Sequence, residues 1–344
     1  MDAAMENAAE TSGSGPEVGS DVVPQLQIIM SAGAREVMDR LGRTEDLRFS
    51  PDGERLAILG FHSNMCGLFS LALDRSAPLP VLYMDGGLEL RSATMKSPHG
   101  VDFLDDDKVV VASRGGKVDI FRLPAASVSG PGSALTPLRL ITRASPFQSL
   151  GMPGSVWVTR RNDLAAQLLV CDNIKHSISS HTVIAGATCV LPGRVLLQQR
   201  LQIPDGVTVS PDGRWMAVSN HASHEIFFYD RSRRLGPDSE PHGIARGVDY
   251  PHGLRFSPDG SSLYVADAGQ PFVLRFSAPE GDWAGDRRES GKIRVMDEET
   301  FLMGRYNPQE GGPKGLELDP GGEVLLVTSD YQRLAAFHIP TVFT

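Results

Sequence analysis

The sequence predicts an all-β fold, a single β-propeller of six blades. One supporting observation is a strand–turn–strand unit that recurs along the chain. Another is the abundance of turn residues, with 36 glycines and 24 prolines in 344 residues, as expected where many short strands are joined by tight turns. A third is the spacing of the units, which is close to that of propeller blades.

The repeated unit is a hairpin centred on a Pro-Asp-Gly turn or an equivalent. Four copies are clear: TEDLRFSPDGERLAILG from Thr44, IPDGVTVSPDGRWMAVSN from Ile203, YPHGLRFSPDGSSLYVAD from Tyr250 and GPKGLELDPGGEVLLVTS from Gly312. Weaker copies begin at Ser97 and Gly151. Proline presets φ in such a turn and glycine accepts a positive φ, so we expect positive φ at Gly213 and Gly260.

Alignment on the start of the first strand of each unit gives six equivalent positions. They are Glu45, His99, Pro153, Asp205, His252 and Lys314, separated by 54, 54, 52, 47 and 62 residues. A seven-bladed ring would need a further unit, and the sequence offers none. The chain after Lys314 has room for three strands, so we expect VVPQLQIIM (22–30) to pair with the last blade and close the ring.

Two segments fall outside the repeat. Residues 1–21 are acidic, small and polar, and predict a disordered tail before a single propeller domain at 22–344. Residues 278–292, APEGDWAGDRRESGK, are a polar insertion between two strands of the fifth blade. Either a lid over one face or a mobile hairpin fits this insertion.

Composition excludes several classes of protein. A net charge of −9 offers no basic stripe for nucleic acid. The 1–21 segment lacks the apolar stretch of a signal peptide, and no run is long enough to cross a bilayer. Cys66, Cys171 and Cys189 lie far apart, which fits neither a zinc ribbon nor a disulfide framework, although one disulfide is compatible. We therefore expect a cytoplasmic protein that acts on a small molecule; its oligomeric state stays open.

The aligned positions supply the candidate site, because innermost strands line the channel and their starts meet at one mouth. Five of the six carry ionisable groups. As metal ligands we predict Glu45, Asp205 and His252, and as catalytic groups His99, His252 and Lys314. A divalent cation, Ca²⁺ or a transition metal, suits this set. The Lys314 ammonium would repel a metal, and could instead hold a substrate carboxylate or an oxyanion. A polar, water-lined channel without chemistry is the alternative.

A second tier of polar residues closes the following strands: Asn220, His221, Asp267, Ser329 and Asp330. We interpret His221 and the nearby His224 as ordinary loop residues. The sequence contains no GxSxG, P-loop, HExxH or GxGxxG motif.

Two stretches resemble known propeller enzymes. SPHGVDFLDDD from Ser97 resembles the PHG segment of paraoxonase-type lactonases, whose histidine lies beside the catalytic calcium. PDGVTVSPDGRWMAVSNHASHEIFFYD from Pro204 is similar to blades of those enzymes and of gluconolactonase/regucalcin-type and YVTN-type propellers. The resemblance implies a six-bladed lactonase-type propeller.

The resemblance also implies roles for single residues. His99 matches the PHG histidine, and Glu45 matches a first-blade glutamate that binds metal. Asp205 stands where those families have a ligand asparagine, and His252 where they have aspartate or asparagine. These two departures argue against calcium as the bound ion more than they argue against the location of the site.

Three functions are compatible with these observations. The first is a metal-assisted hydrolase of a lactone or ester, in which His99 or His252 acts as general base. The second is a metal-independent lyase, isomerase or cyclase on the same ring. The third is a non-catalytic binding or scaffold propeller.

Overall fold

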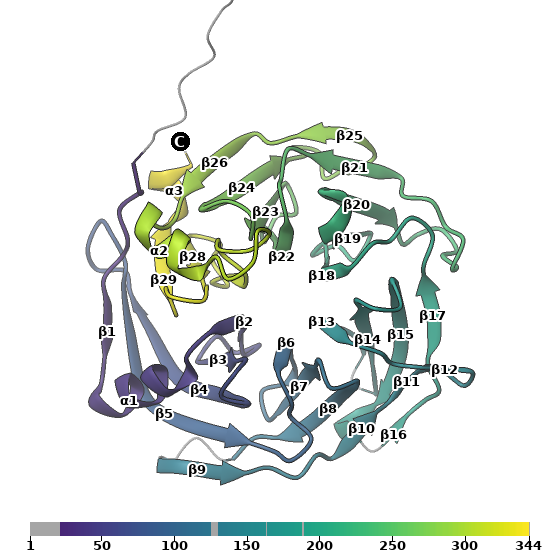
Figure 1. The fold of residues 1–344 in the computed structure, drawn as a ribbon, viewed down its shortest axis with the longest axis horizontal. Coiled ribbons are helices and arrows are strands. Elements are labelled where there is room, and N and C mark those ends of the chain that lie inside the picture. Colours follow the sequence, from purple (N-terminus) through teal and green to yellow (C-terminus); the bar gives the residue numbers. More distant parts are fainter. Residues whose placement is uncertain (1–20, 125–129, 163, 188, 344) are drawn as a thin grey trace, which may run out of the picture.

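The computed structural model describes residues 21–124, 130–162, 164–187 and 189–343. Six small sheets stand around a central axis, which confirms the six-bladed propeller (Figure 1). The predicted disordered tail lies outside the described residues, apart from Asp21. No helix in the described ranges is long and apolar enough to cross a membrane.

Each blade is an antiparallel sheet whose first strand is innermost. The first blade comprises β2 (Thr44–Phe49), β3 (Arg55–Gly60), β4 (Met65–Asp74) and β5 (Val81–Arg91). The second comprises β6 (Pro98–Asp105), β7 (Lys108–Ser113), β8 (Lys117–Arg122) and β10 (Arg139–Ile141). The third comprises β13 (Pro153–Asn162), β14 (Ala165–Asp172), β15 (Ser177–Ile184), β16 (Cys189–Val190) and β17 (Arg194–Leu197). A small separate sheet pairs β11 (Arg143–Ser145) with β12 (Gln148–Ser149).

The remaining blades follow the same order. The fourth blade comprises β18 (Pro204–Val209), β19 (Trp215–Asn220), β20 (Glu225–Asp230) and β21 (Gly243–Arg246). The fifth comprises β22 (Pro251–Phe256), β23 (Ser262–Asp267), β24 (Phe272–Ser277) and β26 (Gly291–Arg294). The sixth comprises β27 (Leu316–Leu318), β28 (Val324–Val327) and β29 (Ala335–His338). Buried Val, Leu, Ile and Phe side chains pack between adjacent blades, where most of the core lies.

The Pro-Asp-Gly turns form as predicted. φ is +75° at Gly213 and +73° at Gly260. In the turn before Gly213, the Ser210 hydroxyl donates to Asp212, and its oxygen accepts from the Trp215 amide. Side-chain bonds therefore fix the hairpin in addition to backbone preference.

Three extra strands cover the outer edges of two blades (Figure 1). β1 (Ile28–Met30) and β9 (Gly130–Ala134) each pair in parallel with β5, and β25 (Gly285–Arg288) pairs in parallel with β21. β9 and β25 come from segments that follow later in the chain than the sheets they join. Such strands protect exposed sheet edges from pairing with other chains.

The expected pairing of 22–30 with the last blade is therefore wrong. The segment crosses the outside of the last blade with one amide bond from Leu26 to Ala336 of β29, and its strand then forms on β5. Pro24 explains the change, because it has no amide to donate to a ladder on β29. The segment still joins the first and last blades.

Insertion 278–292 is neither the lid nor the mobile hairpin expected from its composition. It carries β25, and its Trp283 is fully buried. The indole stacks on Phe228 at 4.8 Å between ring centroids, and its Nε1 donates to the Gly260 carbonyl at 3.1 Å. The insertion thus joins the fourth and fifth blades.

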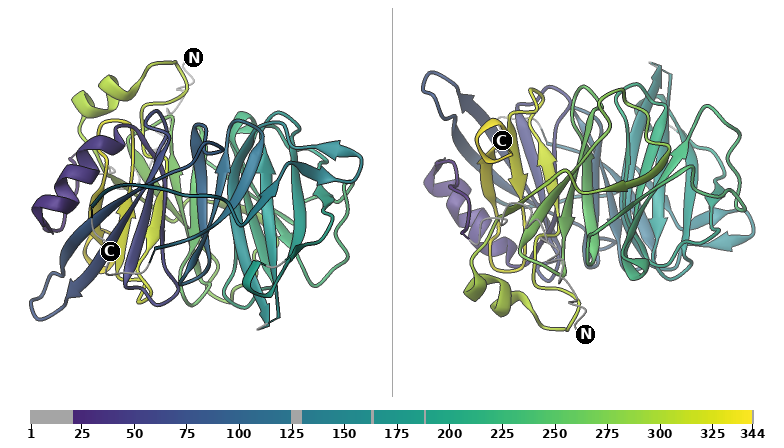
Figure 2. Two further views of the ribbon diagram at one scale, coloured as in Figure 1. Left: turned by 90° about the horizontal axis from the view of Figure 1, so that it is seen from below. Right: turned by 90° about the horizontal axis from the view of Figure 1, so that it is seen from above.

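Helices lie outside the ring. α1 (Ala32–Leu41) is capped by Ser31 and packs on β5; α2 (Glu298–Gly304) projects from one end of the ring, and α3 (Ile339–Val342) follows β29 (Figure 2). All three cysteines are free, so the structure contains no disulfide among them.

Candidate functional site

The five ionisable residues predicted from the repeat meet at one mouth of the channel. Glu45, His99, Asp205 and His252 are each the second residue of an innermost strand, and Lys314 lies two residues before β27. All five side chains are buried, with between 0 and 3% of each residue exposed. Gly100, Gly206, Gly253 and Gly315 follow four of them, and a Cβ at any of these would lie within 2.7 Å of a neighbouring backbone atom.

Four of these residues form a compact cluster. His99 Nε2 lies 3.5 Å from Glu45 Oε2, and His252 Nε2 lies 3.8 Å from the same oxygen. His252 Nε2 also lies 3.2 Å from Asp205 Oδ2. The two imidazole rings are 5.1 Å apart at an angle of 34°. These four side chains are therefore close enough to share one small-molecule site.

Both imidazoles are held neutral. Burial, followed by the charge of Arg114, lowers the pKa of His99 to about 3. Burial lowers the pKa of His252 to about 4, although Asp205 opposes the shift. His99 Nδ1 lies 2.9 Å from the Gly154 carbonyl, so it carries the proton and leaves Nε2 as an acceptor. Arg114 Nη2 donates to that Nε2 at 2.6 Å.

Asp205 is ionised and heavily bonded. Its Oδ1 accepts from Asn173 Nδ2 at 2.7 Å and from Arg114 at 3.3 Å. Burial alone would raise its pKa, but His252 and Arg114 hold it well below the usual range. Asp205 therefore binds Asn173 and Arg114 through Oδ1, while its Oδ2 faces the imidazoles of His252 and His221.

An outer layer of charged residues covers the cluster, and most of these residues were not predicted from the sequence. Arg43 Nε contacts Glu45 and lies 3.1 Å from Asp330 Oδ1. Glu310 Oε2 lies 2.5 Å from Lys314 Nζ. Although burial would raise the pKa of Glu310, Lys314 lowers it to about 2. The side chains of Arg43, Arg114 and Glu310 are 19 to 20% exposed, so this layer separates the cluster from solvent.

His221 also belongs to the site, contrary to its interpretation as a loop residue. It begins the short turn η2 (His221–Ser223) after β19 and is buried. Its Nδ1 lies 4.0 Å from Asp205 Oδ2, and its Nε2 lies 4.0 Å from Glu310 Oε1. The signal in the sequence was its position at the end of the second strand of its blade, a position that it shares with Asp330 of the sixth blade.

The other second-tier residues hold turns. Asn220 accepts from the Gln202 amide, Asp267 from the amides of Asp249 and Tyr250, and Ser329 from that of Gln332.

A second ring of charges fills the channel below the cluster. It lies three positions further along the innermost strands, at Arg48, Asp102, Arg255 and Glu317. Arg48 lies 3.0 Å from Asp102 and 2.8 Å from Glu317, and Arg255 lies 3.1 Å from Glu317. Both guanidinium groups lie over Trp157, at 4.6 and 5.7 Å. All these charged residues are buried, and each takes part in at least one ion pair.

The cluster has donors that fit a metal ion. One ligand atom each from Glu45, His99 and His252 lies within 4.8 Å of the others. Glu45 Oε2 and His252 Nε2 are buried without a hydrogen-bond partner. The bond from His99 Nδ1 to a backbone carbonyl is how metal-binding histidines are usually oriented. Compared with the predicted ligands, His99 takes the place of Asp205.

Comparisons with known proteins identify the architecture. No family model matches the sequence, and no curated protein matches it. A solved structure of a candidate 6-phosphogluconolactonase from Bacteroides uniformis ATCC 8492 matches with a TM-score of 0.51 and 15% identity, over 85% of this chain and 80% of the other. At this identity the likeness concerns the fold. Together with the six blades, it agrees with the propeller fold predicted from the repeat and from the resemblance to lactonase-type propellers.

Proposed function

We propose that the protein is a metal-dependent hydrolase that cleaves a lactone or an ester at the channel mouth. The observation that carries this proposal is the unpartnered, buried Glu45 Oε2, which faces the Nε2 atoms of His99 and His252 at 3.5 and 3.8 Å. A buried carboxylate oxygen without a donor is costly. A divalent cation held by these three residues would remove that cost.

The donor set favours a transition metal. Two neutral imidazoles and a carboxylate suit Zn²⁺, Mn²⁺ or Fe²⁺ better than Ca²⁺, which takes oxygen ligands. When bound, such an ion polarises a carbonyl group and lowers the pKa of water. The departures of Asp205 and His252 from the ligands of calcium lactonases agree with this choice.

His221 is the candidate general base. With His99 and His252 committed to the metal, His221 is the remaining imidazole of the cluster, and its Nδ1 has no hydrogen-bond partner. It would accept a proton from the attacking water as the water oxygen bonds to the carbonyl carbon, and would then donate that proton to the alkoxide oxygen that leaves when the ring or ester C–O bond breaks. Asp205 Oδ2, 4.0 Å away, would stabilise the imidazolium.

Lys314 and Glu310 support a role in substrate binding. Lys314 is buried, and although burial opposes it, Glu45 and Glu310 raise the pKa of its ammonium. Glu310 comes from the loop between α2 and β27, and its carboxylate lies where a substrate carbonyl or carboxylate would meet Lys314. Movement of this loop would expose the cluster and free the ammonium to stabilise an oxyanion.

A second candidate rests on Arg114. Its guanidinium donates a hydrogen bond to His99 Nε2, the atom that a metal would need as a ligand. With Lys314 it gives the mouth two cations that could stabilise an enolate or oxyanion without metal. A lyase, isomerase or cyclase is the function that this arrangement favours.

The test is the metal content and hydrolytic activity of the purified full-length protein. We expect about one transition-metal ion per chain, and turnover in a panel of γ- and δ-lactones and aryl esters that is lost on chelation. E45Q should lose both while keeping its circular dichroism, whereas E36Q, a change on the exposed face of helix α1, should lose neither. H221Q should keep the metal and lower kcat by about 100-fold or more.

Three results would contradict the proposal. Activity in metal-free protein would favour the lyase-type candidate. A metal unaffected by E45Q would place the ion elsewhere. Absence of both metal and turnover would leave a binding propeller.

A further inference from the structure

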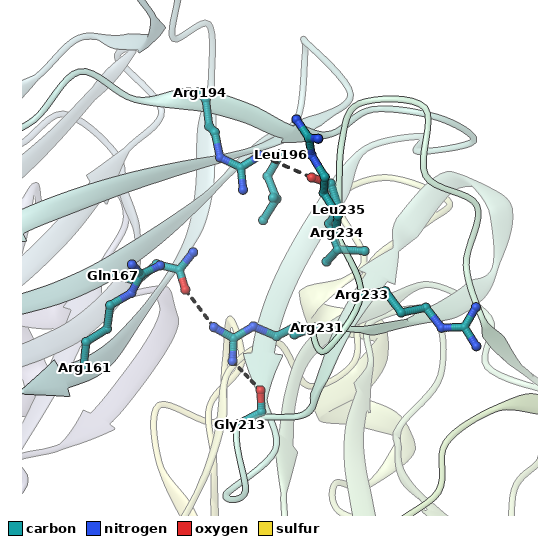
Figure 3. A pocket seen from close by; sticks show the side chains of 9 residues that line it. All are labelled: Arg161, Gln167, Arg194, Leu196, Gly213, Arg231, Arg233, Arg234 and Leu235. Carbon is teal, nitrogen blue, oxygen red and sulfur yellow. Dashed lines mark hydrogen bonds between the residues drawn. The ribbon is translucent and has the colours of Figure 1, made fainter.

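A pocket rich in arginine lies between the third and fourth blades, away from the channel. It has a volume of about 480 Å³ and is lined by Arg161, Gln167, Arg194, Leu196, Gly213, Arg231, Arg233, Arg234 and Leu235. Figure 3 shows Arg161, Arg194 and Arg231 reaching into it from different sides, while Arg233 points away. Volumes of this size are typical of small-molecule sites.

The three converging guanidinium groups lack counterions. In the described part of the chain none forms an ion pair with a carboxylate, whereas Arg233 lies 3.8 Å from Asp230. Arg231 is half-buried and bonded only to neutral acceptors, the Gln167 side chain and the Gly213 carbonyl, both at 2.7 Å. Burial, and then the charge of Arg161, lowers the pKa of Arg231. The whole protein has a net charge of −9, so the excess of positive charge is local to this pocket.

The pocket lies on the opposite face of the ring from the mouth. Arg161 is near the end of β13, Gly213 is in the turn that follows β18, and Arg231 directly follows β20. First and third strands of a blade run in the same direction, so these positions lie at the far end from Glu45 and its equivalents. The pocket is therefore separate from the proposed hydrolytic site.

We propose that this pocket binds a small molecule through a phosphate or pyrophosphate group. Guanidinium groups donate pairs of parallel hydrogen bonds that match phosphate oxygens, and three of them favour an anion with at least two charges. Leu196 and Leu235 provide apolar surface for the rest of the ligand. Gln167 holds Arg231 in place without neutralising it.

Two variants test the site with pyrophosphate as the probe, by isothermal titration calorimetry on the full-length protein. R161Q/R194Q removes two exposed charges and should weaken binding at least about tenfold. Its control, R35Q/R122Q, removes two exposed arginines outside this pocket and should bind as wild type. Q167E keeps the side-chain size but gives Arg231 a carboxylate, so it should abolish binding while raising the melting temperature.

The outcomes separate the proposal from general attraction of anions. Saturable binding with one site per chain, lost in R161Q/R194Q and Q167E and kept in the control, would support it. No binding of pyrophosphate or inorganic phosphate by the wild type would overturn it. So would equal weakening in both double variants, or malonate binding as tightly as pyrophosphate. Metal content at the mouth should not change in any variant.

Discussion

Replacing Lys314 with methionine would remove a buried ammonium that lies 2.5 Å from Glu310 Oε2 and 4.0 Å from Asp330 Oδ1. The pKa of Glu310 falls from 4.5 to about 2; burial opposes this fall, and Lys314 is its principal cause. At about 1.4 kcal/mol per tenfold change in proton affinity, that corresponds to about 3 kcal/mol of stability at neutral pH. Breaking a buried ion pair costs a similar amount.

The dependence on pH follows from the depressed pKa. The contribution of Glu310 is fully present above its unfolded value, near pH 4.5, and is lost as the pH falls through about 2. Urea unfolding should therefore give a difference between wild type and K314M of about 3 kcal/mol at pH 7 and about half that at pH 3. The same change made on an E310Q background should cost less at pH 7 and lose most of its dependence on pH. A K314M protein as stable as wild type, or a cost unchanged in acid, would refute the reasoning.

Three further predictions concern the fold. Deleting residues 1–20 should leave the melting temperature unchanged, while deleting 1–30 should lower it, because β1 and the Leu26 amide are lost; equal melting temperatures would contradict the role of this segment. G213V and G260V should each cost about 1–2 kcal/mol in urea unfolding, since φ is positive at both and the neighbouring atoms leave room; G236V, at a negative φ with no atom nearby, is the control. W283A should cost about 3–5 kcal/mol by removing a fully buried indole, and a cost under 1 kcal/mol would show that the insertion is not part of the core.

The repeat made the inner surface of the ring predictable. Because each blade presents the same offset to the axis, aligning SPDG units was enough to bring Glu45, His99, Asp205 and His252 together. The same alignment, read three residues further, contains Arg48, Asp102, Arg255 and Glu317. The sequence therefore encodes both rings, although only the strand starts were predicted as a site.

Residues outside the repeat could not be placed in this way. Glu310 comes from a loop with no counterpart in other blades, and its position depends on bonds from Gly311 and Gly312 to the Ala268 carbonyl. Arg43 precedes the inner strand β2 and Arg114 follows β7, and arginine side chains are long enough to reach several neighbours. The parallel strands β1, β9 and β25 depend on contacts between distant segments, which local patterns do not encode.

The exchanged outer strands also affect how the chain can fold during synthesis. The sheet of the first blade gains β9 only after residue 134 has emerged, and that of the fourth gains β25 only after residue 288. A nascent chain that ended at either blade boundary would expose the edge of β5 or β21, a state prone to pairing with other chains. The smallest fragments able to fold without an open edge should therefore span adjacent blades.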